Sequence, residues 1–134
     1  MVVLDTNVVI DSLHGDSRVI DAIDTYSEGS KLSITVVNQY ELLRGLIPED
    51  EQGNERLREF LSSLIIHTLG EKEINCSAEI YQKLKERGKH VNELDIIIAG
   101  IAISNSERLL TSDKDFRSIK SSSPVWDRQI VLPK

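Results

Sequence analysis

Residues 2–5 read VVLD, a short apolar run that ends in an acid. We interpret residues 2–4 as a buried strand and Asp5 as the first polar side chain at its carboxyl end. A second run of this kind, LLTSD at residues 109–113, ends at Asp113. Ligands of open α/β sheets bind in the crevice beyond the carboxyl ends of the strands. Both acids are therefore expected to line such a crevice.

The rest of the chain alternates between strand and helix patterns. Alternating or continuous apolar runs predict strands at residues 2–4, 31–35, 65–67, 108–111 and 129–132. Apolar residues three and four apart predict helices at residues 16–26, 36–47, 51–64, 71–87 and 92–103. Residues 121–124 are predicted to form a loop. This order predicts an α/β fold, a single domain over residues 1–134 with a mostly parallel central sheet and helices on both faces.

The composition fits a globular protein of the cytoplasm. The chain has 134 residues, 22 Asp and Glu against 16 Lys and Arg, and one cysteine, Cys76, which cannot form an intramolecular disulfide. Its longest apolar run, residues 96–103, is far shorter than the roughly 20 residues that span a bilayer. Residues 1–79 carry 15 acids and 6 bases, and residues 80–134 carry 7 acids and 10 bases. The second part therefore has a local basic surface, most simply a solvated helix face and alternatively a docking strip for a polyanion.

Each candidate acid also has a simpler structural interpretation. Asp5 and Asp113 could cap helices or turns, which is common for Asp after a strand. Asp95 begins an apolar helix, where it could belong to a capping box with Asn92, although Ala99 and Ala102 on its face leave space for a site. An isolated Glu such as Glu41 more often pairs with a base on its own helix.

A cluster of these acids would imply a bound cation. Converging carboxylates repel one another, and without a cation their pKa values rise at a cost to stability. Hard oxygen ligands favour Mg²⁺ or Mn²⁺ over zinc or copper. The histidines have no metal-binding spacing and are interpreted as incidental; they are His14, His67 and His90.

Four segments together resemble the PIN-domain nucleases and, within them, the small VapC-type toxin ribonucleases. The segments are LDTNVVID at 4–11, YELLRG at 40–45, DIIIAGIA at 95–102 and LTSDKDF at 110–116. The resemblance implies an endoribonuclease that hydrolyses RNA phosphodiester bonds with Mg²⁺ or Mn²⁺. The residues implied to bind the metal and to catalyse the reaction are Asp5, Glu41, Asp95 and Asp113.

The resemblance also implies supporting residues and partners. Residues matching the family's supporting positions are Thr6, Asn7, Thr111, Ser112 and Asp115. Small departures are Gly100, where Ala is common, and Tyr40, where a small residue is usual. A toxin of this type is expected to form a homodimer and to be silenced by a cognate antitoxin protein. Bases that we consider as RNA contacts are Lys83, Lys85, Arg87, Lys89, Lys114 and Arg117.

Three other interpretations stay open at this point. The chain could be a housekeeping RNA-processing nuclease on the same fold, or a catalytically silent nucleic-acid-binding module. A more remote alternative is a phosphatase of the haloacid dehalogenase type, which begins with a strand-end D-x-D-x-T pattern. In this chain Asn7 stands at the position of the second Asp of that pattern, so the carboxyl group that acts as general acid in such a phosphatase is absent.

Overall fold

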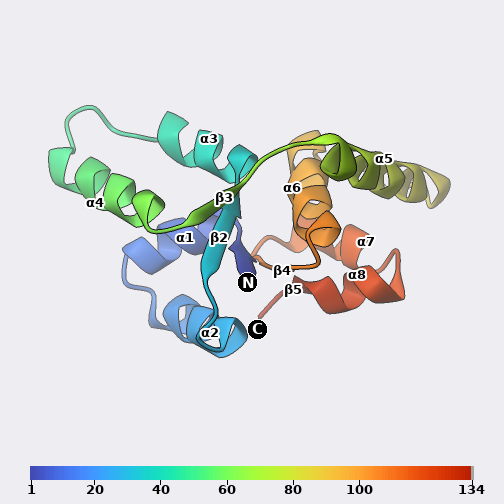
Figure 1. Ribbon diagram of the computed structural model, residues 1–134, viewed down its shortest axis with the longest axis horizontal. Helices are drawn as coiled ribbons and strands as arrows, with labels where there is room; N and C mark the ends of the chain where they lie inside the picture. Colours follow the sequence, from blue (N-terminus) through green and yellow to red (C-terminus); the bar gives the residue numbers. More distant parts are fainter. Residues whose placement is uncertain (134) are drawn as a thin grey trace.

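Five short strands form one parallel sheet in the computed structural model, which describes residues 1–133 (Figure 1). The strands are β1 (Val2–Leu4), β2 (Leu32–Thr35), β3 (Ile65–His67), β4 (Arg108–Leu110) and β5 (Ile130–Val131). Their order in the sheet is β3-β2-β1-β4-β5. The predicted α/β class with a parallel sheet is confirmed.

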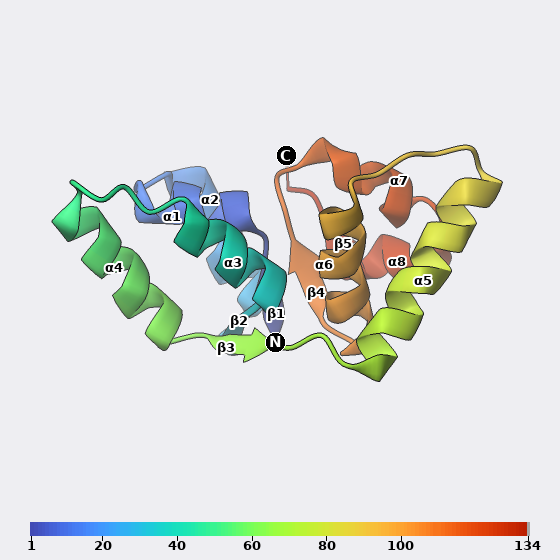
Figure 2. The same ribbon diagram turned by 90° about the horizontal axis from the view of Figure 1, so that it is seen from above.

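Helices cover both faces of this sheet (Figure 2). The helices before β3 are α1 (Thr6–Leu13), α2 (Ser17–Ser27), α3 (Val36–Arg44) and α4 (Glu51–Ser62). Those after β3 are α5 (Glu71–Glu86), α6 (Glu93–Ser104), the single 3₁₀ turn η1 (Lys114–Phe116), α7 (Arg117–Lys120) and α8 (Pro124–Gln129). Two apolar clusters match this division. One joins α1–α4 to Leu4 and Leu110, and the other joins α5–α8 to Val3 and Leu109.

The direction of the strand connections changes between β1 and β4. These neighbouring strands belong to connections that run in opposite directions, because β1 leads to β2 through α1 and α2 while β4 leads to β5 through α7 and α8. A parallel sheet opens a crevice at such a switch point, beyond the carboxyl ends of its strands. Asp5 follows β1 and Asp113 lies shortly after β4, so the fold places both acids at this edge.

Several helices differ from the sequence prediction. Helix α1 was not expected, because its β-branched residues Val8, Val9 and Ile10 do not favour a helix. The Asp5 cap and the burial of Val8 and Val9 against the sheet favour it in the folded chain. Helices α7 and α8 are too short for a periodic pattern. Pro124, expected in a loop, is the first residue of α8, which Ser123 caps.

Helix α6, which carries Asp95, packs closely against α5. A Cβ atom placed on Gly100 would lie 2.9 Å from the Cα atom of Ser77 and closer still to its hydroxyl. The Gly100 that departs from the usual Ala is therefore explained by Ser77, which leaves no room for a methyl group. None of the described helices is long and apolar enough to cross a membrane.

A buried polar cluster connects three strands away from the crevice. Glu107, which precedes β4, accepts a 3.0 Å hydrogen bond from the Ser33 hydroxyl of β2. Its Oε2 atom also lies 2.8 Å from Nε2 of His67 in β3. His67, which the sequence suggested was incidental, therefore contributes to packing between strands.

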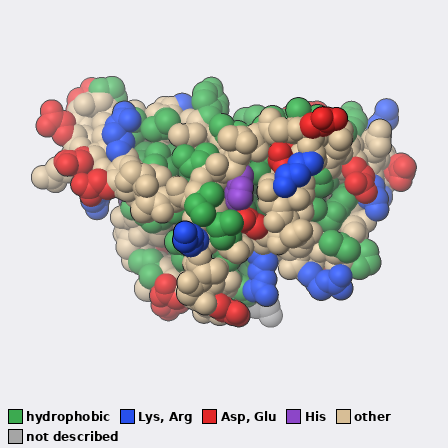
Figure 3. Space-filling view, in the orientation of Figure 1, with side chains coloured by type: hydrophobic (Ala, Val, Ile, Leu, Met, Phe, Trp, Pro, Cys, Tyr) green, Lys and Arg blue, Asp and Glu red, His purple; other side chains and the backbone are tan. Residues whose placement is uncertain are grey.

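Charge is distributed unevenly over the surface. Acidic side chains gather at the end of the molecule where α4 begins, and basic side chains are more frequent at the opposite end (Figure 3). At the start of α4, Glu49, Asp50 and Glu51 follow one another in the chain and are all exposed. The acidic first part and the more basic second part of the sequence thus occupy different halves of the molecule.

Candidate functional site

Asp5 lies at the carboxyl end of β1 and is 5% exposed. Its Oδ1 atom accepts the backbone N–H of Thr6 at 2.9 Å, which caps α1. Its Oδ2 atom accepts the hydroxyl of Thr111 at 2.7 Å. Asp5 is therefore both a helix cap and a side chain of the crevice, and the two interpretations of the sequence hold together.

Glu41 is positioned by a hydrogen-bond chain that starts at the end of β2. Thr35 donates both its backbone N–H and its hydroxyl to Oδ1 of Asn38, at 2.9 and 2.7 Å. The Asn38 amide then donates to Oδ1 of Asp5 at 3.3 Å and to Oγ1 of Thr6 at 3.1 Å. The Thr6 hydroxyl donates to Oε1 of Glu41 at 2.7 Å. These contacts connect α3 directly to Asp5.

Asn38 is a site residue that the sequence analysis does not single out. It is fully buried, and its amide group donates to one predicted acid, Asp5, and to the Thr6 hydroxyl, which in turn donates to the other, Glu41. The available signal was its place three residues after Thr35, the spacing of a capping box, which the structure shows. That signal predicts a helix start and says nothing about a neighbouring carboxylate.

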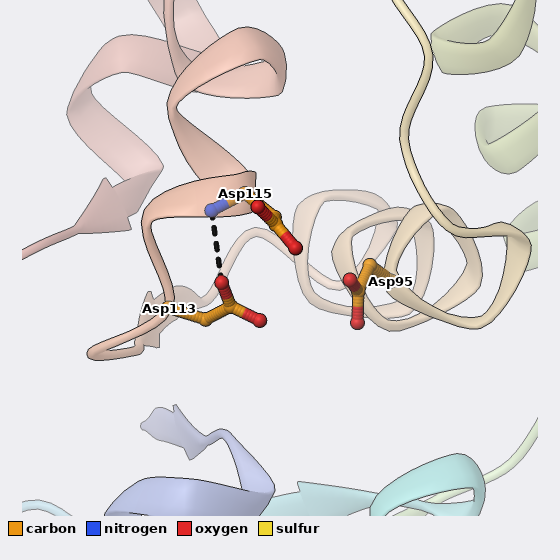
Figure 4. A group of neighbouring side chains, drawn as sticks. All are labelled: Asp95, Asp113 and Asp115. Atoms are coloured by element: carbon orange, nitrogen blue, oxygen red, sulfur yellow. Dashed lines mark hydrogen bonds between the residues drawn. The ribbon is translucent and has the colours of Figure 1, made fainter.

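Three more acids converge from the other side of the crevice. Asp95 in the first turn of α6 faces Asp113 and Asp115, and each of the three offers an oxygen atom within 4.8 Å of the others (Figure 4). Asp113 accepts the backbone N–H of Asp115 at 2.9 Å, which caps η1. The Asp113 N–H donates to Oγ1 of Thr111 at 3.0 Å, so one threonine holds both strand-end acids.

The acids influence one another electrostatically. The pKa of Asp95 is raised to about 7, mainly by burial and then, in decreasing order, by the negative charges of Asp5, Asp113, Glu41 and Asp115. Burial also raises the pKa of Asp5, while its bonds from Thr111 and Thr6 oppose the change and Glu41 and Asp113 add to it. The five carboxylates therefore form one mutually repelling group.

This group has the chemistry of a divalent-cation site. The donors are carboxylate oxygens with hydroxyl and amide support, which Mg²⁺ and Mn²⁺ prefer. Among the ion pairs of residues 1–133, Arg44 is the one cation that reaches any of the five acids, at 3.7 Å from Glu41 and with its side chain 54% exposed. A carboxylate cluster with so little internal compensation fits a bound cation.

The remaining predicted supporting residues lie around the acids. Thr6 and Thr111 are hydrogen-bonded to them, as described above. Asn7 and Ser112 are exposed neighbours of Thr6 and Asp113 in the chain, and neither makes a side-chain hydrogen bond within residues 1–133. Tyr40 is 59% exposed beside Glu41, with the Arg44 guanidinium 5.3 Å from its ring centre. The site therefore has an aromatic residue at its rim.

The six candidate RNA contacts occupy different environments. Arg87 donates to the Ser118 carbonyl and to the hydroxyls of Ser121 and Ser122, at 2.7–3.3 Å, and so joins α5 to α7. Lys83 lies 5.2 Å from the ring centre of Trp126. Lys85 and Lys89 line a depression at the carboxyl end of α5. The two bases that follow Asp113, both exposed, are Lys114 and Arg117.

Comparison with known families agrees with this arrangement. The profile of the PIN domain matches residues 2–121, nearly the whole chain. The chain belongs to the PIN-domain family. The family predicted from the sequence is thereby confirmed. No curated protein matches it.

Solved structures of toxin–antitoxin complexes share the fold of this PIN domain. A chain of VapBC2 from Rickettsia felis, solved bound to a DNA fragment of its promoter, is 26% identical, with a TM-score of 0.75, over 87% of this chain and 92% of that one. A chain of VapBC-1 from nontypeable Haemophilus influenzae is 20% identical, with a TM-score of 0.79, over 98% of both chains. A toxin–antitoxin complex from Klebsiella pneumoniae contains a chain that is 22% identical, with a TM-score of 0.76, over 100% of this chain and 98% of that one.

Proposed function

We propose that this protein is a metal-dependent endoribonuclease and the toxin of a toxin–antitoxin pair, with residues 1–134 acting as one domain. The observation that carries the proposal is the convergence of Asp95, Asp113 and Asp115 at the switch point of a PIN-domain sheet. Burial and the charges of the neighbouring acids, Asp5 and Glu41 among them, raise the pKa of Asp95 to about 7. The similarity to VapBC chains supports the toxin role.

The metal ligands would be Asp5, Glu41, Asp95 and Asp113, with Asp115 in support. A bound Mg²⁺ or Mn²⁺ would supply a hydroxide from water and neutralise charge that develops on the attacked phosphate. Thr111 fixes Asp5 and the Asp113 backbone, and Asn38 fixes Asp5 relative to Thr6. These buried hydrogen bonds hold the ligands in place before substrate binds, which lowers the cost of reorganisation during the reaction.

The decisive experiment measures cleavage of a mixed pool of labelled single-stranded RNAs by the wild type and by Asp95→Asn, each with Mg²⁺, Mn²⁺ or EDTA. We expect cleavage by the wild type with metal, and none with EDTA or in the variant. Asp24→Asn, an exposed change on α2, serves as the matched control and should cleave like the wild type. A wild type that binds Mn²⁺ but cuts no RNA would contradict the nuclease and favour a nucleic-acid-binding module.

An antitoxin is proposed to bind beside Glu41. A depression of about 260 Å³ between α1, α3 and α4 includes Glu41 in its lining. Apolar side chains stand exposed around it, with Ile47 at 57% and Ile10 at 37%. A partner helix that places an Arg among the acids would gain paired, charge-assisted hydrogen bonds. Purification from the source cells should yield a bound protein whose removal restores RNA cleavage; a bound protein that leaves cleavage unchanged would contradict this role.

A homodimer is proposed to form through α5 and α6. These helices line an apolar groove of about 510 Å³, beside which Ile74 is 53% exposed and Tyr81 45% exposed. Lys85 and Glu93 also line the groove and would pair reciprocally across a two-fold axis. Light scattering should show a dimer that Ile74→Asp disrupts. Ile47→Asp, on the far half of the molecule, is the control and should leave the dimer intact; a monomeric wild type would contradict the proposal.

A further inference from the structure

A small pocket lies on the side of the sheet covered by α1 and α2, against the segment that leads from β4 to Asp113. Its volume is about 230 Å³. Leu110 and Ser112 line it, and these two residues flank Thr111, the residue that bonds Asp5 and Asp113. Because alternate residues of an extended segment point to opposite sides, Leu110 and Ser112 face this pocket while Thr111 faces the acids. The pocket and the acids therefore lie on the two sides of one short segment, residues 110–112.

The lining combines an apolar wall with charged groups. The apolar part consists of Val8, Val19, Ala22 and Pro133, together with Leu110. The charged part consists of Asp11, Asp16 and Arg18. The volume is below the roughly 300–1,000 Å³ typical of pockets for drug-sized ligands, so it suits a flat group of about the size of a nucleobase.

The backbone holds the charged residues of the pocket in position, while their side chains form no ion pairs within residues 1–133. The backbone N–H of Asp16 donates to the Asp11 carbonyl at 3.0 Å, which fixes the two acids relative to each other. The Asp16 Oδ1 atom accepts the N–H of Arg18 at 3.0 Å as the cap of α2, and its Oδ2 atom has no such bond. None of Asp11, Asp16 and Arg18 takes part in an ion pair of the described residues.

We propose that this pocket binds one base of the RNA substrate, a guanine, next to the phosphate that is cut. Two carboxylates repel a phosphate and accept from N–H donors, and guanine offers two neighbouring donors, N1–H and the N2 amino group, on one edge. Its other edge carries the O6 and N7 acceptors, which an Arg side chain binds in bidentate fashion. Proteins read single-stranded RNA by such contacts to unpaired bases held against side chains.

This inference rests on the proposed nuclease function and names the part of the substrate that selects the cleavage site. Asp16→Asn is the most informative change. Asn caps helices as well as Asp does, so α2 keeps its cap, but one carboxylate oxygen becomes an N–H donor that faces the guanine donors. Asp21→Asn, an exposed acid on the same helix that does not line the pocket, is the matched control.

The first test sequences the ends produced from an RNA pool with randomised positions. We expect guanosine to be enriched at one fixed position beside the cut in the wild type and in Asp21→Asn. Asp16→Asn should lose about tenfold or more of that preference, the effect expected for one bidentate base contact. Metal-dependent cleavage with no preferred base, or with a preference that Asp16→Asn leaves unchanged, overturns the inference while the nuclease stands.

The second test needs no catalysis and separates this inference from the proposed function. Guanosine 5′-monophosphate is titrated into the metal-free protein, and backbone amide shifts are followed by NMR. Shifts at Val19, Ala22 and Ser112 that exceed those caused by adenosine 5′-monophosphate support the pocket, even for a chain that cuts no RNA. N-acetyl-arginine amide also carries paired N–H donors. If it binds there more tightly than the guanosine nucleotide, the pocket takes a cationic peptide and the inference is wrong.

Discussion

The hydroxyl of Thr111 donates a 2.7 Å hydrogen bond to Oδ2 of Asp5, across 106 residues of sequence. The same oxygen of Thr111 accepts the N–H of Asp113 at 3.0 Å. One fully buried side chain therefore sets the positions of the acids that end β1 and follow β4. The two neighbouring strands of the switch point are joined at the place where the chemistry is proposed.

Thr111→Val tests this link. Valine keeps the shape of threonine but leaves a buried carboxylate oxygen and the Asp113 N–H without their partner, which costs about 1–3 kcal/mol. We expect this loss in the free energy of unfolding in urea and a fall of at least tenfold in RNA cleavage. Thr111→Ser restores the hydroxyl and should recover most of the activity. Equal activity in the Val and Ser variants would show that the bond does not position the acids.

Asp5→Asn separates the two roles of Asp5. The variant keeps an oxygen that can cap α1 but loses the charge that would hold a metal. We expect cleavage and Mn²⁺ binding to be lost, whereas the circular dichroism spectrum stays that of the wild type. Because burial and neighbouring acids raise the pKa of Asp5, its neutral replacement should also not lower the stability of the metal-free protein. An unfolded variant would mean that Asp5 is mainly structural.

The acidic cluster also predicts how the stability of the metal-free protein depends on pH. The pKa of Asp95 rises from 3.8 to about 7 on folding, so between these values the folded state binds more protons than the unfolded state. The contribution of Asp95 to stability is therefore greatest at low pH and is lost as pH rises toward 7. Thermal unfolding in EDTA from pH 4.5 to 8 should show a falling midpoint in this window.

Two comparisons isolate the contribution of Asp95. Asp95→Asn should flatten the pH dependence, and Mn²⁺ should raise the midpoint most at the upper end of the range, where the carboxylates are ionised. Asp127→Asn, on the exposed surface of α8, should leave the slope unchanged. A slope identical in the wild type and Asp95→Asn would contradict the raised pKa.

Part of this site could be predicted from sequence because of where strands end. Asp5 and Asp113 follow apolar runs, and in a parallel sheet the carboxyl ends of neighbouring strands share an edge. No local sequence pattern, however, predicts that Asn38 bonds Asp5 or that Thr111 bonds both Asp5 and Asp113. Those contacts depend on how the helices lie over the sheet. Arg87 is a similar case. Its charge suggests RNA, but its three serine partners lie 31–35 residues away in the sequence.

Gly100→Ala tests the close contact between α5 and α6. Alanine is the better helix former by about 1 kcal/mol, but its methyl group would press on Ser77, and overpacking of this kind costs about 1–3 kcal/mol. We expect a net loss of stability and, because α6 carries Asp95, weaker Mn²⁺ binding. Ser77→Gly combined with Gly100→Ala should recover part of the loss. If Gly100→Ala alone is as stable as the wild type, the contact is not tight.

Lys114 is predicted to contact the RNA backbone, whereas Arg87 is predicted to stabilise the fold. Lys114 is exposed between Asp113 and Asp115, where an RNA backbone must pass if the acids cut it. Each phosphate contact made by a base contributes about one unit to the slope of log affinity against log salt, somewhat less for single strands. Lys114→Gln should therefore weaken the binding of single-stranded RNA and reduce that slope.

Arg87→Gln should leave the slope unchanged and instead lower the unfolding midpoint, because Arg87 is committed to hydrogen bonds with α7 and the turn after it. Fluorescence anisotropy at several salt concentrations, in an Asp95→Asn background that prevents cleavage, gives both slopes. The opposite result, a reduced slope in Arg87→Gln alone, would move the path of the RNA toward the carboxyl end of α5.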